Sequence, residues 1–132
     1  MLDTSTLVSA ALRPDSVPRR AFQRIVARHE ICVSSATLDE LFEVLARRKF
    51  ERYLEHAERM AFAELYRAHT RLFAVLTEVS DCRDPKHNKF LSLALTCAAD
   101  VIVASDQDLL VLHPYRKIPV LTPAALLEDQ RF

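Results

Sequence analysis

Short apolar stretches alternate with helix-patterned stretches along this chain of 132 residues, and this alternation constrains the fold more than any other feature. Residues 31–33 and 101–104 have the composition of buried strands, whereas Leu38, Leu41 and Leu45 recur at helical spacing. Strands that alternate with helices favour a parallel sheet with helices on its faces. We therefore predict one α/β domain over residues 1–132, a three-layer α/β/α sandwich around a central, mainly parallel sheet.

The remaining segments extend this pattern. Residues 1–3 resemble the end of a first strand, residues 51–69 a long polar helix, and residues 72–79 a β-like run. Pro14 and Pro18 predict a turn between the first two helices. The two helices predicted between the second and third strands depart from strict alternation, and we expect them to cover one face of the sheet.

The composition excludes several functional classes. The chain has no glycine, although average usage of roughly 7% would supply about nine. Every glycine-rich phosphate cradle is therefore excluded, so phosphate recognition must come from a metal, from Arg and Lys, or from helix N-termini. With 18 basic and 18 acidic residues, the charge provides no global case for nucleic-acid binding. Local basic clusters remain candidates, and one of them contains Arg47, Arg48, Lys49 and Arg52.

The cysteines and the hydropathy pattern bear on the compartment. Cys32, Cys82 and Cys97 are widely spaced and odd in number, so they predict three reduced, mostly buried thiols rather than a disulfide framework or a zinc site. No stretch is long and apolar enough to span a bilayer, and we see no secretion signal. We expect a cytoplasmic protein with no membrane association.

Acidic residues occur where the predicted strands give way to helices. Four occupy the junctions and a fifth follows two residues after the last: Asp3, Glu40, Asp84, Asp106 and Asp108. The carboxyl ends of parallel strands meet at one edge of a sheet, where open α/β folds build their sites. Clustered carboxylates are costly unless a cation binds among them. The pattern predicts a site for a hard divalent metal and the hydrolysis of phosphodiester bonds.

Each of these acids also has a purely structural interpretation. Asp3 and Asp84 could cap the helices that follow them. Thr37 and Glu40 fit a capping box, with Thr37 as the N-cap and Glu40 at the third helical position. At Glu40 the capping and metal-ligand interpretations compete for one geometry.

The last two junctions are more informative. Ser105 and Asp108 can form a cap pair, which would leave Asp106 without a structural role. His87 precedes Phe90 by three residues and therefore shares the inward stripe of its helix. A lone inward histidine is usually a hydrogen-bonded core residue, but at this position it could also be a metal ligand.

Taken together, these segments resemble the PIN-domain family, and in particular its toxin components of bacterial toxin–antitoxin pairs. The similarity covers nearly the whole chain, through DTSTLVSAAL, SSATLDELFEVLARRKF, DPKHNKFLSLALTCAADVIVASDQDLL and IPVLTPAALL. It implies cleavage of single-stranded RNA with one or two Mg²⁺ or Mn²⁺ ions. By motif, Asp3, Glu40 and Asp106 match the first, second and fourth family acids, with Asp84 as a further ligand and Asp108 in support.

The chain departs from the family pattern at three places. His87 stands where the family usually has an inward-facing aspartate, and neutral imidazole suits Mn²⁺ better than Mg²⁺. Ser5 stands where many members have asparagine, and its hydroxyl can still support the site by hydrogen bonding. The lead before Asp3 is very short, which predicts a clipped first strand or a true start upstream of Met1.

Two hypotheses follow. The first is a metal-dependent endoribonuclease in which Asp3, Glu40 and Asp106 are catalytic; the resemblance adds a cognate antitoxin and a homodimer as expected partners. The second, motivated by His87, is a catalytically impaired PIN-like scaffold that binds protein or RNA. A superficial similarity of DTST to the nucleophile loop of haloacid-dehalogenase-like phosphatases carries little weight, because that loop needs a second aspartate where Ser5 stands.

Overall fold

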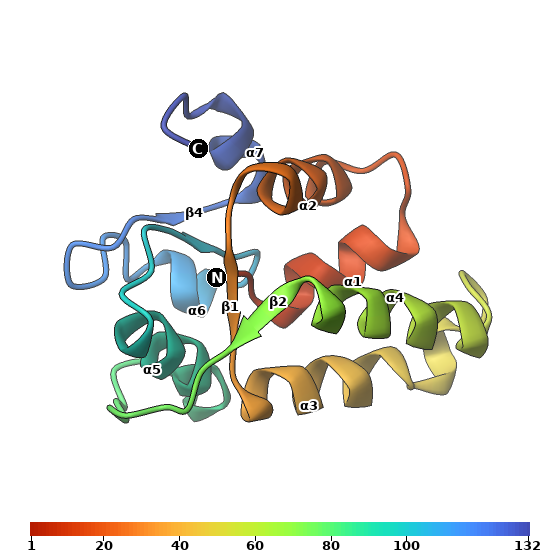
Figure 1. The fold of residues 1–132 in the computed structure, drawn as a ribbon, viewed down its shortest axis with the longest axis horizontal. Helices are drawn as coiled ribbons and strands as arrows, with labels where there is room; N and C mark the ends of the chain where they lie inside the picture. The colour runs from red at the N-terminus through yellow and green to blue at the C-terminus, as the bar shows by residue number, and fades with distance from the viewer.

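The computed structural model describes residues 1–132, and its helices lie on both sides of a few short strands (Figure 1). The strands are β1 (Ile31–Val33), β2 (Thr70–Leu72), β3 (Ile102–Val103) and β4 (Val120–Leu121). The helices are α1 (Thr4–Leu12), α2 (Val17–Arg28), α3 (Ser35–Leu45), η1 (Arg48–Phe50), α4 (His56–Ala68), η2 (Pro85–His87), α5 (Asn88–Thr96), α6 (Gln107–Leu110) and α7 (Pro123–Glu128).

All named strand pairs are parallel. β1 pairs with β2, with Ile31 opposite Thr70, and β3 pairs with β4, with Ile102 opposite Val120. The predicted first strand is reduced to one residue, Leu2, which bridges to β3 in the parallel sense. The α/β class is therefore correct. The hydrogen bonds define two two-stranded sheets and a bridge, and they do not establish the predicted continuous central sheet of a three-layer sandwich.

The strands separate two apolar clusters. Ile31 and Val33 contribute to a cluster of 14 buried residues that includes side chains of α1, α2, α3, α4 and α7. Cys32 packs instead against a second cluster of 12 buried residues, which includes side chains of α5, α6 and β4. Alternate residues of a strand point to opposite faces, so β1 sends its side chains into both clusters. Figure 1 shows the corresponding arrangement, with α3 and α4 on one side of β1 and α5 and α6 on the other.

Several predicted boundaries were wrong. The helix expected over residues 51–69 begins only at His56, because residues 48–54 form η1 and turns. The run 72–79 is a strand only as far as Leu72, and the chain beyond Phe73 pairs with no strand. Pro18 lies in the first turn of α2 rather than in the preceding turn, a position where the missing N–H is harmless.

Because the chain has no glycine, other residues adopt the left-handed backbone conformation that glycine usually provides. Ala98, Arg116 and Lys117 have positive φ angles, of 50°, 46° and 72° respectively. Ala98 follows the C-cap of α5, where glycine is usually preferred because a Cβ atom is disfavoured in the left-handed region.

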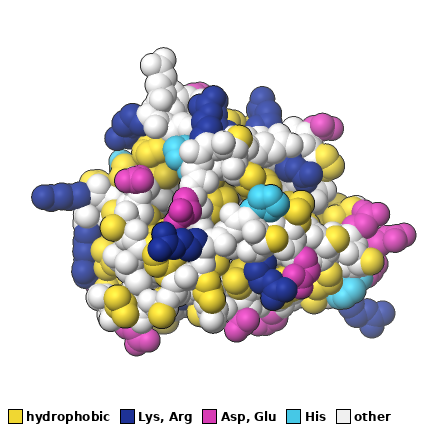
Figure 2. All heavy atoms as spheres, in the orientation of Figure 1, with side chains coloured by type: hydrophobic (Ala, Val, Ile, Leu, Met, Phe, Trp, Pro, Cys, Tyr) yellow, Lys and Arg dark blue, Asp and Glu magenta, His cyan; other side chains and the backbone are white.

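The thiols and the surface complete the description. All three cysteines are free, but only Cys82 is buried, whereas Cys32 and Cys97 are half-buried, contrary to the expectation of mostly buried thiols. Figure 2 shows basic and acidic side chains interspersed over one face, with no broad basic surface. None of the helices combines the length and apolar character that crossing a bilayer requires.

Candidate metal centre

Asp3 is the N-cap of α1, as its structural interpretation predicted, and it also lines the cleft described below. Its Oδ1 accepts a hydrogen bond from the Thr6 N–H at 2.9 Å. Its Oδ2 accepts from the backbone N–H groups of Ser105 at 3.0 Å and Asp106 at 3.4 Å. These bonds tie α1 to the loop after β3. Burial raises the pKa of Asp3 above its ordinary value, against the effect of the three N–H donors.

Glu40 does not belong to the predicted capping box. The box is formed one turn earlier, where the Ser34 side chain accepts from the Thr37 N–H and the Thr37 hydroxyl accepts from the Ser34 N–H. Glu40 is therefore free of capping and faces α1 and α5 across the site. One of its oxygens accepts a hydrogen bond from the Thr4 hydroxyl, and Oε1 lies 2.8 Å from the Lys89 ammonium.

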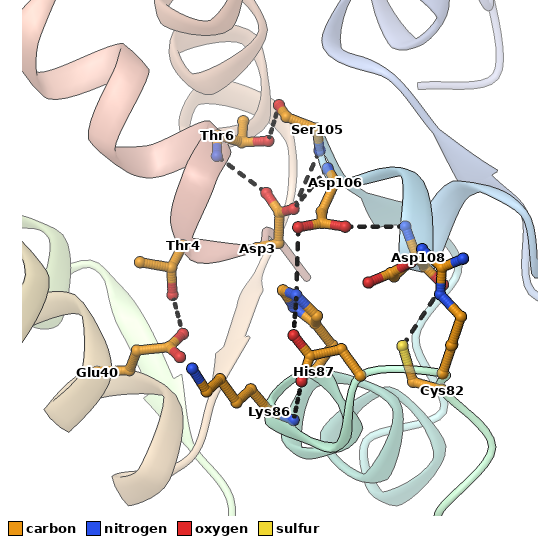
Figure 3. A network of polar contacts seen from close by, with 12 residues as sticks. Asp3, Thr4, Thr6, Glu40, Cys82, Lys86, His87, Ser105, Asp106 and Asp108 are labelled. Atoms are coloured by element: carbon orange, nitrogen blue, oxygen red, sulfur yellow. Dashed lines mark hydrogen bonds and ion pairs between the residues drawn. The ribbon is translucent and has the colours of Figure 1, made fainter.

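The capping predicted after β3 is also reassigned. Asp106, not Ser105, is the N-cap of α6, and its Oδ1 accepts from the Asp108 N–H at 2.8 Å. The Ser105 hydroxyl instead lies 2.8 Å from the Thr6 hydroxyl. Asp106 thus has a structural role after all, and its second oxygen, Oδ2, remains directed toward His87 (Figure 3).

His87 lies between the acids. Its Nε2 is 3.2 Å from Asp106 Oδ2 and 3.8 Å from Asp84 Oδ2. Its Nδ1 is buried and has no hydrogen-bond partner, which is unusual for a buried polar atom. Asp84 caps η2 through the Lys86 N–H, as its structural interpretation predicted.

His87 also belongs to a set of three possible metal ligands. Asp84, His87 and Asp108 can each offer one ligand atom, and these atoms lie within 4.8 Å of one another. Asp108 is also held by Arg83, whose guanidinium lies 2.5 Å from Oδ1. These residues therefore place two carboxylates and an imidazole around one small volume.

A cleft of about 450 Å³ opens beside this cluster. Asp3, Glu40 and His87 line one part of it, and Ser5 lies exposed on its wall. Arg47, Lys49, Phe50 and Lys86 are also among its lining residues. Asp84, Asp106 and Asp108 do not line the cleft. Asp84 and Asp106 approach His87, and the Asp106 N–H also donates to Asp3, so these contacts link them to the acids of the cleft.

The donor set fits a divalent cation. Carboxylate oxygens suit Mg²⁺ and Mn²⁺, and a neutral imidazole favours Mn²⁺ or a later transition metal. The buried Nδ1 of His87 has no hydrogen-bond partner and is therefore an available donor atom, whereas Nε2 already lies close to Asp106. Glu40 fits less directly, because Lys89 already neutralises it and would have to yield to an incoming ion.

Sequence reasoning missed Lys89 and the two threonines of α1. In the sequence, Thr4 and Thr6 have the pattern of ordinary first-turn residues. No local pattern indicates that the Thr4 hydroxyl bonds to Glu40 or that the Thr6 hydroxyl bonds to Ser105. Lys89 did carry a signal, because it lies in the first turn of α5, where a positive charge is unfavourable to the helix dipole.

These features describe a small α/β protein with an acidic, histidine-containing centre beside a partly basic cleft. A family model described as PIN domain matches residues 1–108, which include every residue of this centre. The chain therefore belongs to the PIN-domain family, whose members are generally nucleases that use divalent metals. No curated protein and no solved structure shows a significant match to the chain.

Proposed function

We propose that this protein is a metal-dependent endoribonuclease that cleaves single-stranded RNA. The observation that carries the proposal is that Asp3, Glu40 and His87 line one cleft and that Asp106 contacts both Asp3 and His87, although these residues are far apart in the sequence. Asp3, Glu40 and Asp106 would be catalytic, Asp84 a further ligand, and Ser5, His87 and Asp108 supporting residues.

The centre would hold Mn²⁺ or Mg²⁺ through these side chains, with Mn²⁺ favoured by the imidazole of His87. A bound divalent ion would increase the acidity of water and neutralise charge on the scissile phosphate. The chain's own contribution is to hold the ligands in place, since backbone N–H groups fix the carboxylate of Asp3 and the Thr4 hydroxyl fixes that of Glu40. Lys89, once displaced from Glu40, would be free to pair with a phosphate.

The test is digestion of labelled single-stranded RNA by the pure protein with Mn²⁺, Mg²⁺ or EDTA. We expect cleavage with Mn²⁺ that leaves 5′-phosphate and 3′-hydroxyl ends, and its loss in EDTA and in Asp106→Asn. Asp39→Asn is the matched control, because Asp39 is an exposed acid of α3 that neither lines the cleft nor belongs to the proposed ligands. Equal cleavage in EDTA, or in the Asp106 variant, would refute the proposal.

A second candidate, an impaired scaffold that binds protein or RNA without turnover, is favoured by two observations. His87 replaces the acid that the family usually places there, and Lys89 occupies Glu40. His87→Asp separates the two candidates. If this substitution creates Mg²⁺-dependent cleavage in a protein that otherwise shows none with either ion, the natural chain is the impaired scaffold.

The proposal extends to the biological setting and to the sheet. We propose that the protein is the toxin of a toxin–antitoxin pair, acts in the cytoplasm as a homodimer and is silenced by a cognate antitoxin. We also propose that the strands belong to one central sheet. This is supported by β1, whose side chains point alternately into the two apolar clusters. Light scattering of the pure protein tests the dimer, and a monomer at all accessible concentrations would contradict it.

A further inference from the structure

The structure assigns the segment between α3 and α4 as a preformed grip for single-stranded RNA. In this grip, Arg47 and Lys49 bind backbone phosphates and Phe50 receives a base. The inference rests on the proposed function, because it names the part of the cleft that would hold the substrate of that reaction. The segment comprises residues 47–50. No hydrogen bond or ion pair joins these residues to the acids of the candidate metal centre.

The first observation is where these side chains lie. Arg47, Lys49 and Phe50 line the same cleft as Asp3 and Glu40, and Lys86 of η2 is also among its lining residues. Arg48 and Arg52 belong to the same basic run in the sequence but do not line the cleft. The fold therefore selects two of these four clustered cations for the cleft.

The second observation is the anchoring of this segment by a buried arginine. Arg59 of α4 is fully buried, and its guanidinium donates to the carbonyls of Leu45, Arg47 and Leu54 and to the carboxylate of Glu51. The bond to the Arg47 carbonyl is 2.9 Å long. A buried guanidinium is costly unless its donors are satisfied, and here they are satisfied by the backbone that surrounds residues 47–50. The segment is therefore held in one conformation before any ligand binds, which reduces the entropy lost on binding.

The third observation is that the cations of the cleft form no ion pair with an acidic residue. Arg47, Lys49 and Lys86 form no salt bridge, although nine pairs occur elsewhere in the protein. The Lys49 ammonium lies over the half-buried Phe50 ring, 5.1 Å from its centre, so a base that stacks on this face would displace Lys49 toward a backbone phosphate. An aromatic ring next to unpaired cations is the combination that binds bases and phosphates of single strands without sequence preference.

RNA is favoured over an acidic peptide because of what shares the cleft. A phosphodiester chain held by Arg47 and Lys49 continues toward Asp3 and Glu40, where a bound cation would receive the next phosphate. An acidic peptide would satisfy the cations, but its acidic side chains offer no base to stack on the Phe50 ring.

The experiment measures binding of a fluorescein-labelled ten-nucleotide oligouridylate to the full chain by anisotropy, in EDTA and at several salt concentrations. We expect Arg47→Ala/Lys49→Ala to weaken binding about tenfold near 0.1 M salt, and to reduce the slope of log K against log salt by about 1.4 for two lost phosphate contacts. Arg48→Ala/Arg52→Ala removes the same charge from the same segment and should change both quantities little. Phe50→Leu should weaken binding at every salt concentration while leaving the slope unchanged.

Two results would overturn the inference. Equal loss in both double variants would show a general effect of charge rather than a grip. A poly-glutamate peptide that binds more tightly than the RNA, with the same dependence on Arg47 and Lys49, would identify an acidic protein as the occupant. Because binding is measured in EDTA, failure of the nuclease proposal is distinguishable: the wild-type protein would then bind RNA through these residues but would not cleave it when Mn²⁺ is added.

Discussion

Arg59 provides the sharpest test of the energetics, because this one side chain donates hydrogen bonds to backbone carbonyls along the connection between α3 and α4. Its relative exposure is 0%, and it donates to three backbone carbonyls and one carboxylate. Glu51, the acidic partner, is about half exposed at 53%. The substitution Arg59→Met keeps a long apolar side chain in place and removes every donor.

The expected loss of stability follows from the acceptors that remain. Water can solvate the exposed Glu51 carboxylate, so little is lost there. The carbonyls of Leu45 and Leu54 lose the donor that Arg59 supplies, whereas the Arg47 carbonyl keeps its hydrogen bond from the Phe50 N–H. An unsatisfied buried polar group costs about 1–3 kcal/mol. Allowing for water at the more accessible of these carbonyls, and for apolar packing by Met, we expect a net loss of about 3 kcal/mol. That is a large part of the roughly 5–15 kcal/mol by which a domain is usually stable.

Urea unfolding followed by circular dichroism measures this loss. With a slope of about 1.5 kcal/mol per molar urea, the midpoint should fall by about 2 M. Arg67→Met is the matched control on the same helix, because Arg67 pairs with Glu64 at the surface, where both side chains are more than half exposed. We expect that variant to change stability by less than about 0.5 kcal/mol. A loss below about 1 kcal/mol for Arg59→Met would refute the idea that this arginine holds the segment.

Three further predictions concern other parts of the chain. Ala98→Gly should raise stability by about 0.5–1 kcal/mol in thermal unfolding, because glycine removes the Cβ atom from a left-handed position and loses part of that gain to a more flexible unfolded chain; an unchanged or lower midpoint would contradict this. Ser34→Ala should cost about 1 kcal/mol by removing the N-cap of α3, with Ser35→Ala at the next, exposed position as a nearly neutral control. Hydrogen bonding from the Tyr115 hydroxyl lowers the pKa of Asp81, so the pair stabilises the fold above the ordinary pKa of aspartate and loses that effect as the pH falls; Tyr115→Phe should raise the Asp81 midpoint in an NMR titration, and an unmoved midpoint would show that the bond is absent in solution.

Local sequence patterns were enough for the elements whose signals are local. The strand at residues 31–33 was predicted with its observed bounds, because its short apolar run is flanked by polar residues. The capping of α1 by Asp3 and of η2 by Asp84 also follows from neighbouring residues alone. The failure at residues 72–79 shows the limit of such signals. The Thr96 hydroxyl accepts a hydrogen bond from the Leu76 N–H, and the Ser92 hydroxyl accepts one from the Val79 N–H. These backbone donors therefore bond to side chains of α5, and the β-like composition did not produce a strand.

The sequence supplied a candidate set of site residues, but it could not supply the contacts that those residues make. The positions of the acids at strand-to-helix junctions indicated which edge of the fold would carry them, since parallel strands end together. Which hydroxyl meets Glu40, and which cation neutralises it, depends on contacts across 36 and 49 residues of sequence. The same holds for the exchange of roles between Ser105 and Asp106, where Ser105 is drawn away from capping by Thr6 of α1.

By itself, the sequence determined the class of fold, the acids available for a cation and the absence of any glycine-based phosphate cradle, because these follow from periodicity and composition. The tertiary structure alone decided that His87 approaches Asp84 and Asp106 while it lines the cleft with Asp3, that Lys89 forms an ion pair with Glu40, and that two of four clustered cations line the cleft. These outcomes depend on distances between segments remote in the chain. Burial, which makes each unpaired polar group costly, selects among the partners that the fold brings within reach.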